Sequence, residues 1–199
     1  MFKKIDFKPI LSNIILHTNA KQTDFIDTYG NVGFSSGYLI SNSFKMLLDK
    51  FNCYGFQFFK TYIIQNNLLN ENYWQTNIYD FPFEQIDFKN SKFILNDRDN
   101  NRKIISEIIT FKNIDDFNVI TSKITYPKTI SFNNVVFNKA IDLDFFSLKY
   151  SEGYKGIVSE RLKNIIEMEK LTGIEFRPFE LSLQEWYHNG EREKIYGNV

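Results

Sequence analysis

Cysteine and histidine are nearly absent from this chain, and their scarcity removes several kinds of chemistry. The single cysteine, Cys53, cannot form a disulfide within the chain, so the fold does not require an oxidising compartment. The two histidines, His17 and His188, do not stand at metal-ligand spacing from other ligand residues. We therefore expect no metal and no cofactor. We interpret His17 as a packed or edge residue, because a catalytic histidine needs a positioned partner.

Net charge and long apolar runs are lacking as well. The 24 basic and 24 acidic side chains cancel, so no long-range field attracts phosphate backbones or anionic lipid. No apolar run approaches the roughly 20 residues that a membrane-spanning helix needs. Asp6, Lys8 and Pro9 interrupt the N-terminal stretch, which makes it a poor secretion signal. We expect a cytoplasmic protein without a nucleic-acid or membrane partner.

Apolar residues, in contrast, are plentiful. Of the 199 residues, 43% are hydrophobic and 17% are aromatic. A chain of this size buries roughly 70% of the surface that its unfolded form exposes. The nine glycines and four prolines do not gather in a linker. We therefore predict one well-filled domain over residues 1–199.

Two segments of the chain match without a gap when Ser41 is set on Ser159. The identical pairs are Ser41/Ser159, Lys45/Lys163, Gly55/Gly173 and Phe58/Phe176. Apolar positions coincide at Ile40/Val158, Phe44/Leu162, Leu47/Ile165, Leu48/Ile166 and Phe56/Ile174. A match of both pattern and identity indicates one supersecondary unit used twice. We place the two halves at residues 37–81 and 129–178, followed by a tail at 181–199.

Each copy of this unit predicts a helix followed by a strand. A serine hydroxyl can accept from the free amides of a first helical turn, and apolar residues at helical spacing follow both serines. A glycine stands just past each expected helix end, where a positive φ is common, and an apolar strand follows it. The residues that we interpret as structural are Ser41, Gly55, Phe58, Ser159, Leu162, Gly173 and Phe176.

The remaining pattern predicts strands with few further helices. We expect strands at 10–17, 55–64, 72–81, 92–95 and 174–176, a loop at 21–37, a polar turn at 96–102, a helix at 114–122, and short strands at 129–132 and 135–137 around a turn at Asn133–Asn134. Residues 103–111 fit a strand or a helix, and their isoleucines favour a strand. The tail fits one more helical turn and then frays. The predicted fold is α+β, a single domain with two pseudo-symmetric helix–strand halves around a mixed, mostly antiparallel sheet.

Candidate catalytic groups have simpler structural interpretations. Cys53 lies at a helix C-terminus, whose negative end raises a thiol pKa, so we interpret it as structural. The acid pairs are Asp97/Asp99, Asp115/Asp116 and Asp142/Asp144. Such pairs can hydrolyse glycosides or hold a cation, but pairs in polar loops are more often solvated or capping. Gly30, Gly33 and Gly37 lack the lysine of a phosphate loop and indicate a plain turn. We assign no catalytic residue.

Large amphipathic aromatics outside the repeated helices are the candidates for partner binding. They are Tyr73, Trp74, Tyr79, Trp186 and Tyr187. Tyrosine and tryptophan are frequent anchors of protein interfaces. The competing interpretation is packing in the core or at its rim, because an aromatic-rich chain also has an aromatic core.

The second copy and the run before it resemble the carboxy-terminal signature of a family of immunity proteins from bacterial polymorphic toxin systems. The residues that carry the resemblance are Val136-Phe137, Asp142, Asp144-Phe145-Phe146, Ser159-Glu160-Arg161-Leu162 and Gly173-Ile174-Glu175-Phe176. The first copy is similar to the amino-terminal half of such proteins, so the resemblance covers residues 37–178.

The resemblance implies a protein that binds a cognate toxin domain and blocks it, without enzymatic activity. We expect a preformed interface with aromatic anchors that covers the cleft of the toxin. Two other hypotheses remain open. One is a non-catalytic interaction module for another protein or a glycan, and the other is a hydrolase that uses Asp142 and Asp144. Arg161 can pair with Glu160, Asp142 or Asp144.

Overall fold

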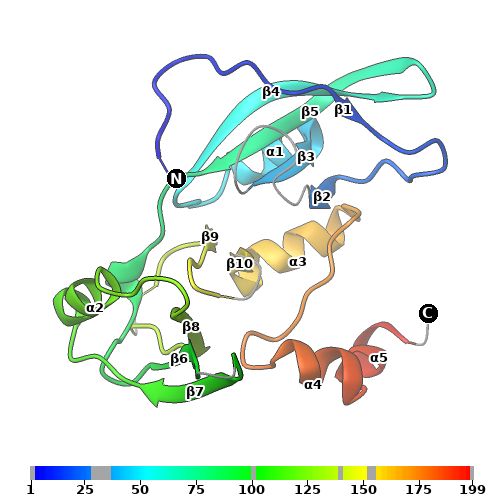
Figure 1. Cartoon of the computed structure of the whole chain (residues 1–199). Coiled ribbons are helices and arrows are strands. Elements are labelled where there is room, and N and C mark those ends of the chain that lie inside the picture. The colour runs from blue at the N-terminus through cyan, green and yellow to red at the C-terminus, as the bar shows by residue number, and fades with distance from the viewer. Residues whose placement is uncertain (1–2, 28–36, 100–101, 139–140, 152–155, 198–199) are drawn as a thin grey trace.

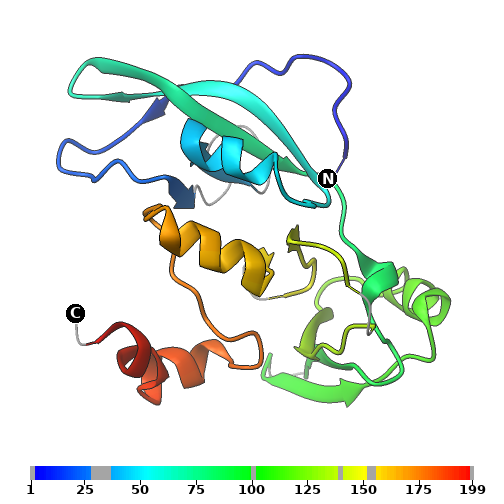
Figure 2. The same cartoon turned by 180° about the vertical axis from the view of Figure 1, so that it is seen from behind.

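The computed structural model describes residues 3–27, 37–99, 102–138, 141–151 and 156–197, and it confirms an α+β single domain (Figures 1 and 2). The strands are β1 (Ile14–Ile15), β2 (Phe25–Asp27), β3 (Tyr38–Ser41), β4 (Phe56–Gln65), β5 (Leu68–Ile78), β6 (Lys92–Arg98), β7 (Ile104–Ile109), β8 (Thr129–Asn134), β9 (Phe145–Ser147) and β10 (Gly156–Val158). The helices are α1 (Asn42–Leu48), α2 (Ile114–Thr121), α3 (Glu160–Met168), α4 (Leu183–His188) and α5 (Glu191–Tyr196), with a 3₁₀ turn at Phe83–Gln85.

The strands form three separate sheets and not the one shared sheet that we expected. The largest has the order β1-β4-β5-β3-β2, and only its β1–β4 pair is parallel. The second is the hairpin β9–β10, and the third has the order β7-β6-β8. The long β4–β5 hairpin turns at Asn66 and Asn67, both with positive φ, as a two-residue primed turn requires.

The described residues form three hydrophobic cores: an upper one, a lower one, and a third on the large sheet around Leu39, Ile63 and Tyr73. Strand β9 contributes to the upper and lower cores. The upper core packs α1 against α3 through Phe44, Leu48 and Leu162, and Phe145 of β9 joins it. The lower core lies between α2 and the three-stranded sheet β7-β6-β8, which we call the small sheet. Phe146 of β9 belongs to this core. Successive strand residues point to opposite faces, which sends these two phenylalanines into different cores. Figure 1 shows α3 crossing the middle of the molecule, with α1 and the large sheet above it and the small sheet and the C-terminal helices below.

The helix starts were predicted correctly. The Ser41 hydroxyl accepts from the Phe44 amide at 3.1 Å, and the Ser159 hydroxyl accepts from the Leu162 amide at 3.1 Å. Helix α2 begins at an N-cap that we did not predict: the Asn113 side chain accepts from the Asp116 amide.

The helix ends were predicted wrongly. Helix α1 ends at Leu48 and α3 at Met168, several residues before Gly55 and Gly173. Both glycines do have positive φ, but for another reason: a Cβ on Gly55 would lie 2.1 Å from the Asp80 carbonyl oxygen. A Cβ on Gly173 would lie 2.2 Å from the Phe25 carbonyl oxygen. These glycines permit close backbone approach and do not stop the helices.

The segment after α3 is also not the strand that the repeat predicted. Residues 174–176 have no strand partner among the described residues, since the tail occupies that side. The Tyr196 hydroxyl donates to the Phe176 carbonyl and accepts from its amide at 2.7 Å. Arg192 forms two-pronged bonds with Glu175. The tail therefore does not fray after one turn but forms α4 and α5 and packs on this segment.

Of the remaining sequence predictions for strands and turns, some are confirmed and others are wrong. Residues 103–111 contain the strand β7, as their isoleucines indicated. Residues 96–98 continue β6, and Asn133 and Asn134 end β8, so neither forms the turn that we expected there. Residue Phe137 makes only an isolated bridge to Ile86. The loop around Gly30 and Gly33 and the centre of the turn at 96–102 lie outside the described residues.

Candidate functional site

A carboxylate on the second half holds the end of a helix from the first half. The side chain of Asp144, only 2% exposed, accepts from the backbone amide of Asn52 at 3.0 Å, four residues after α1 ends. It also accepts from the Ser159 hydroxyl at 2.6 Å, at the cap of α3. Arg161 completes the cluster with bonds at 3.1 and 2.6 Å. One carboxylate therefore ties the end of α1 to the start of α3.

A second carboxylate, that of Asp24, links the start of α1 to the segment that follows α3. Asp24 accepts from the Ser41 hydroxyl at 2.7 Å, at the cap of α1. It also accepts from the backbone amide and the hydroxyl of Thr172 at 2.8 and 2.9 Å, four residues after α3 ends. In both places the serine amide donates to the backbone carbonyl of the aspartate at 2.8 Å. Asp144 thus binds the segment that follows α1, and Asp24, which lies before residues 37–81, binds the segment that follows α3.

Burial and hydrogen bonding act in opposite directions on these two aspartates. Burial alone raises the pKa of Asp144, but the bonds from Arg161, Ser159 and the Asn52 amide lower it more. Burial likewise raises the pKa of Asp24, and the Thr172 amide and the hydroxyls of Ser41 and Thr172 reverse the direction. Both pKa values end below the ordinary range, so both groups are ionised and engaged in structural bonds.

The pair Asp142/Asp144 is not arranged for hydrolysis. Asp144 is buried and held by its three partners, whereas Asp142 is exposed and its backbone carbonyl accepts from the Asn52 side chain. Paired catalytic carboxylates must both face a common cleft, and the Asp144 carboxylate is occupied by Asn52, Ser159 and Arg161. Of the three acids open to Arg161, the one that it binds is Asp144.

The pKa of the Cys53 thiol is raised, as we predicted, but the cause is different: α1 ends at Leu48, five residues before Cys53, and burial is the main effect. Burial raises its pKa to about 12, and the negative charges of Asp144 and Asp49 add to the effect. Because only the thiolate attacks electrophiles or binds metals, this residue is structural at ordinary pH.

The structure does not bring the five aromatic candidates onto one surface, although Trp186 and Tyr187 line the same cleft. Tyr73 is 4% exposed in the core of the large sheet, and its hydroxyl donates to the Thr23 carbonyl. Trp186 is 2% exposed, and its indole donates to Glu175 at 2.8 Å, so it anchors α4. These two rings serve packing in the free protein.

Trp74 lies at the centre of a part-exposed patch on the large sheet. The ammonium groups of Lys45 and Lys60 lie 5.2 and 4.9 Å from its ring, and Lys45 also lies 4.9 Å from the ring of Phe58. The Trp74 indole donates to the Asn42 side chain at 3.0 Å, which fixes the ring against α1. We call Lys45, Phe58, Lys60 and Trp74 the Trp74 patch. It is rigid, because every member stands on a helix or a hairpin strand.

Tyr79 and Tyr187 stand on other surfaces. Tyr79 is half-buried beneath the ammonium group of Lys4, which lies 5.7 Å from its ring. Tyr187 is 55% exposed and lines a cleft of about 770 Å³ between α3 and the C-terminal helices. The charged residues that line this cleft are Glu160, Lys163, Glu167, Glu175, Arg177 and Glu180. Glu160 pairs with Lys163, while one guanidinium nitrogen of Arg177 is buried without a hydrogen-bond partner.

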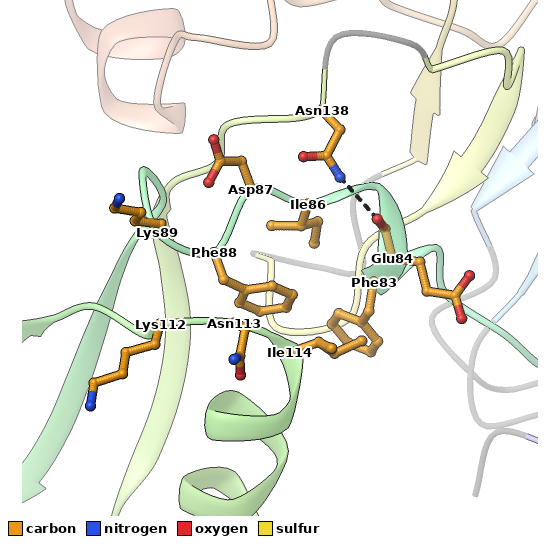
Figure 3. Close-up of a pocket in the computed structure, with 10 residues that line it drawn as sticks. All are labelled: Phe83, Glu84, Ile86, Asp87, Phe88, Lys89, Lys112, Asn113, Ile114 and Asn138. Atoms are coloured by element: carbon orange, nitrogen blue, oxygen red, sulfur yellow. Dashed lines mark hydrogen bonds between the residues drawn. The ribbon is translucent and has the colours of Figure 1, made fainter.

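A smaller pocket of about 230 Å³ lies beside the start of α2 (Figure 3). Phe83, Ile86 and Phe88 form its apolar side, and Lys89 and Lys112 stand at its rim. The Asn138 side chain closes one end by donating to the Glu84 carbonyl at 3.0 Å. This volume is below the range of about 300–1,000 Å³ that is usual for ligand pockets.

The described ranges contain no group of three or more metal-ligating side chains. No helix within them has the length and apolarity to cross a bilayer. The two residues that sequence reasoning missed are Asp24 and Lys60. Asp24 carries a recognisable signal, since an Asp-Phe pair stands at the start of β2 and of β9, at Asp24-Phe25 and at Asp144-Phe145. Lys60 stands opposite Trp74 in the β4–β5 register, which sequence alone does not fix.

A family model described as "Immunity protein family (Imm11)" matches residues 3–181 of the chain. A search of curated proteins and a search of solved structures found no match.

Proposed function

Because the chain belongs to the Immunity protein family (Imm11), we propose that it binds a cognate bacterial toxin domain and neutralises it by covering the toxin's active cleft. The observation that carries this proposal is the extent of the family match, which spans residues 3–181. A match of that extent includes the buried residues of all three cores and both aspartate-held caps, while α4 and α5 lie beyond it.

We place the centre of the toxin interface at the Trp74 patch. Interface anchors combine an aromatic ring with a rigid support and a polar rim, and this patch has all three. The exposed Lys60 suits an acidic side chain on the toxin surface, whereas the Lys45 ammonium already pairs with Asp49. Tyr187 is the second candidate, on the other side of α3. Tyr73 and Trp186 support the surfaces from inside and do not touch the toxin in this proposal.

Co-expression tests the function itself. The toxin domain is taken from the gene beside the one that encodes this chain, and both are produced in one bacterial strain. We expect growth to be rescued and a stoichiometric complex to elute from a sizing column. Failure of both rescue and complex formation would overturn the proposal.

Substitution tests the place of the interface. We expect Trp74→Ala to fold but to weaken toxin binding by about fivefold or more, the equivalent of about 1 kcal/mol. Lys60→Ala, which keeps the ring, weakens it less. Phe7→Ala is the matched control, because Phe7 is 67% exposed in the N-terminal segment. Unchanged affinity for Trp74→Ala, measured by calorimetry, would move the interface away from this patch.

The interaction-module hypothesis predicts a different ligand for the same patch. A module of that kind would bind an unrelated protein or a glycan and leave the toxin free. The same Trp74→Ala protein, tested against a glycan array and against the toxin, separates the two functions.

A further inference from the structure

The strand β7 is an apolar edge strand that the rest of the described molecule leaves uncovered. It lies at the outer margin of the molecule in both views (Figures 1 and 2), and in the sheet order β7-β6-β8 it pairs only with β6. Its isoleucines 104, 105 and 108 are 61%, 55% and 61% exposed. Edge strands of this kind offer free backbone donors and acceptors to another strand.

This edge lacks the features that usually prevent pairing. The strand reads Ile-Ile-Ser-Glu-Ile-Ile, with no proline and no lysine within it. Its pairing with β6 runs from Ile104 to Ile109 without a bulge. Proteins protect exposed edges with lysine, proline or bulges. An edge without them is expected to be covered in the working state of the protein.

The order of residues in β7 fits a second copy of the same strand. A two-fold axis between antiparallel edges must lie normal to the sheet, so each residue faces one that points to the same side. An axis through Ser106 places Ile104 of each copy opposite Ile108 of the other, on the outer face that Ile94 also lines. The two Ser106 residues then face each other.

Charge favours the same register. An axis through Glu107 would set the two glutamates directly opposite, and like charges in that position destabilise a sheet. An axis through Ile105 would overlap only residues 104–106. With the axis through Ser106, Glu107 faces Ile105 of the other copy and no like charges meet. The chain carries no net charge, so no long-range repulsion opposes the approach of two copies.

We propose that two copies of this chain associate through antiparallel pairing of their β7 strands about Ser106, which joins the two small sheets into one continuous six-stranded sheet. The Trp74 patch lies on the other, larger sheet, so both copies keep it available. The inference does not depend on the toxin function.

Sedimentation over a concentration series tests the proposal. We expect the wild-type protein to reach twice the monomer mass. Ile108→Lys, which places a charge opposite an isoleucine of the other copy, raises the dimer dissociation constant by at least about tenfold. Val119→Lys is the matched control, because Val119 is an apolar residue on α2 with 54% exposure. It leaves the dimer intact, and thermal melting checks that both variants fold.

Cysteine cross-linking tests the register. Under mild oxidation Ser106→Cys forms a disulfide-linked dimer, and Glu107→Cys forms markedly less, because only position 106 lies on the axis. The native Cys53 does not compete, since burial raises the pKa of its thiol to about 12. A wild-type protein that stays monomeric throughout the series overturns the proposal. So does a loss of toxin binding in Ile108→Lys without any dimer in the wild type, which would assign β7 to the toxin.

Discussion

The caps of α1 and α3 are built from the same pieces but are held with different strength. At both caps a serine hydroxyl accepts from a backbone amide and donates to an aspartate, and that aspartate receives the end of the other helix. Asp24 is half-buried and bound by hydroxyl and amide groups alone. Asp144 is buried and also pairs with Arg161. The comparison teaches that one local design can serve as a surface cap in one half and as a buried link in the other.

The largest difference is expected from removing the two carboxylates. Asp144→Ala leaves the Asn52 amide and the Ser159 hydroxyl without their acceptor, while water solvates the 65% exposed Arg161 side chain, so we expect a loss of about 2 kcal/mol in the free energy of unfolding. Asp24→Ala costs about half as much, because water can replace part of its bonds. Urea denaturation measures both, and exposed Asp142→Ala is the control with an effect near zero. Equal losses for the two variants would contradict the comparison.

Acid should act on the same two groups. Their pKa values are lowered in the folded protein below the ordinary 3.8, so the unfolded chain binds protons more readily. The stabilisation is therefore complete above about pH 4 and is lost as the pH falls through the folded pKa values. We expect Asp144→Asn to flatten this acid limb more than Asp24→Asn does, as measured by denaturation at a series of pH values. A variant with the wild-type slope would remove Asp144 from the explanation.

Removal of either capping serine should lower the free energy of unfolding by nearly the same amount, unlike removal of the two aspartates. Ser41→Ala and Ser159→Ala each remove one capping bond, and we expect each to cost about 1 kcal/mol. Ser122→Ala serves as the control, because Ser122 follows α2 and caps no amide of a helix start. Thermal melting distinguishes these cases. A cost confined to one serine would show that the caps are not equivalent.

The smallest effect is expected on the reactivity of the Cys53 thiol, which should respond to only one of the two aspartates. The charge of Asp144 helps to raise the pKa of this thiol, while Asp24 does not contribute. Native Cys53 should react slowly with iodoacetamide, and Asp144→Asn should speed the reaction more than Asp24→Asn does. Equal acceleration by both variants would mean that opening of the fold, and not the local charge, controls the rate.

Sequence predicted what is local in these two regions and missed what is distant. Ser41 and Ser159 were identified because a cap depends only on a serine and the turn after it. The partners Asp24 and Asp144 lie 17 and 15 residues from their serines, and nothing in the local pattern fixes that contact. Gly55 and Gly173 were assigned positive φ correctly, but their reason is a carbonyl oxygen from another segment. The alternation at 174–176 indicated a strand. A strand needs a hydrogen-bonded neighbouring strand, and the C-terminal tail packs where that neighbour would lie.

The candidate site follows the same rule. Trp74 was selected for its residue type, and its part-exposed position agrees with that selection. Tyr73 and Trp186 were selected for the same reason but are buried, because a ring's exposure depends on which face of a strand or helix meets the core. The register that sets Lys60 opposite Trp74 belongs to the hairpin and became visible only in the structure.

The short strand β9 has a mechanical consequence. Phe145 lies in the upper core and Phe146 in the lower core, from adjacent positions on one strand. If the upper or the lower core unfolds, the other core loses one of its buried phenylalanines as well. We therefore expect the molecule to unfold in one cooperative step, without a populated partly folded intermediate that a protease could cleave.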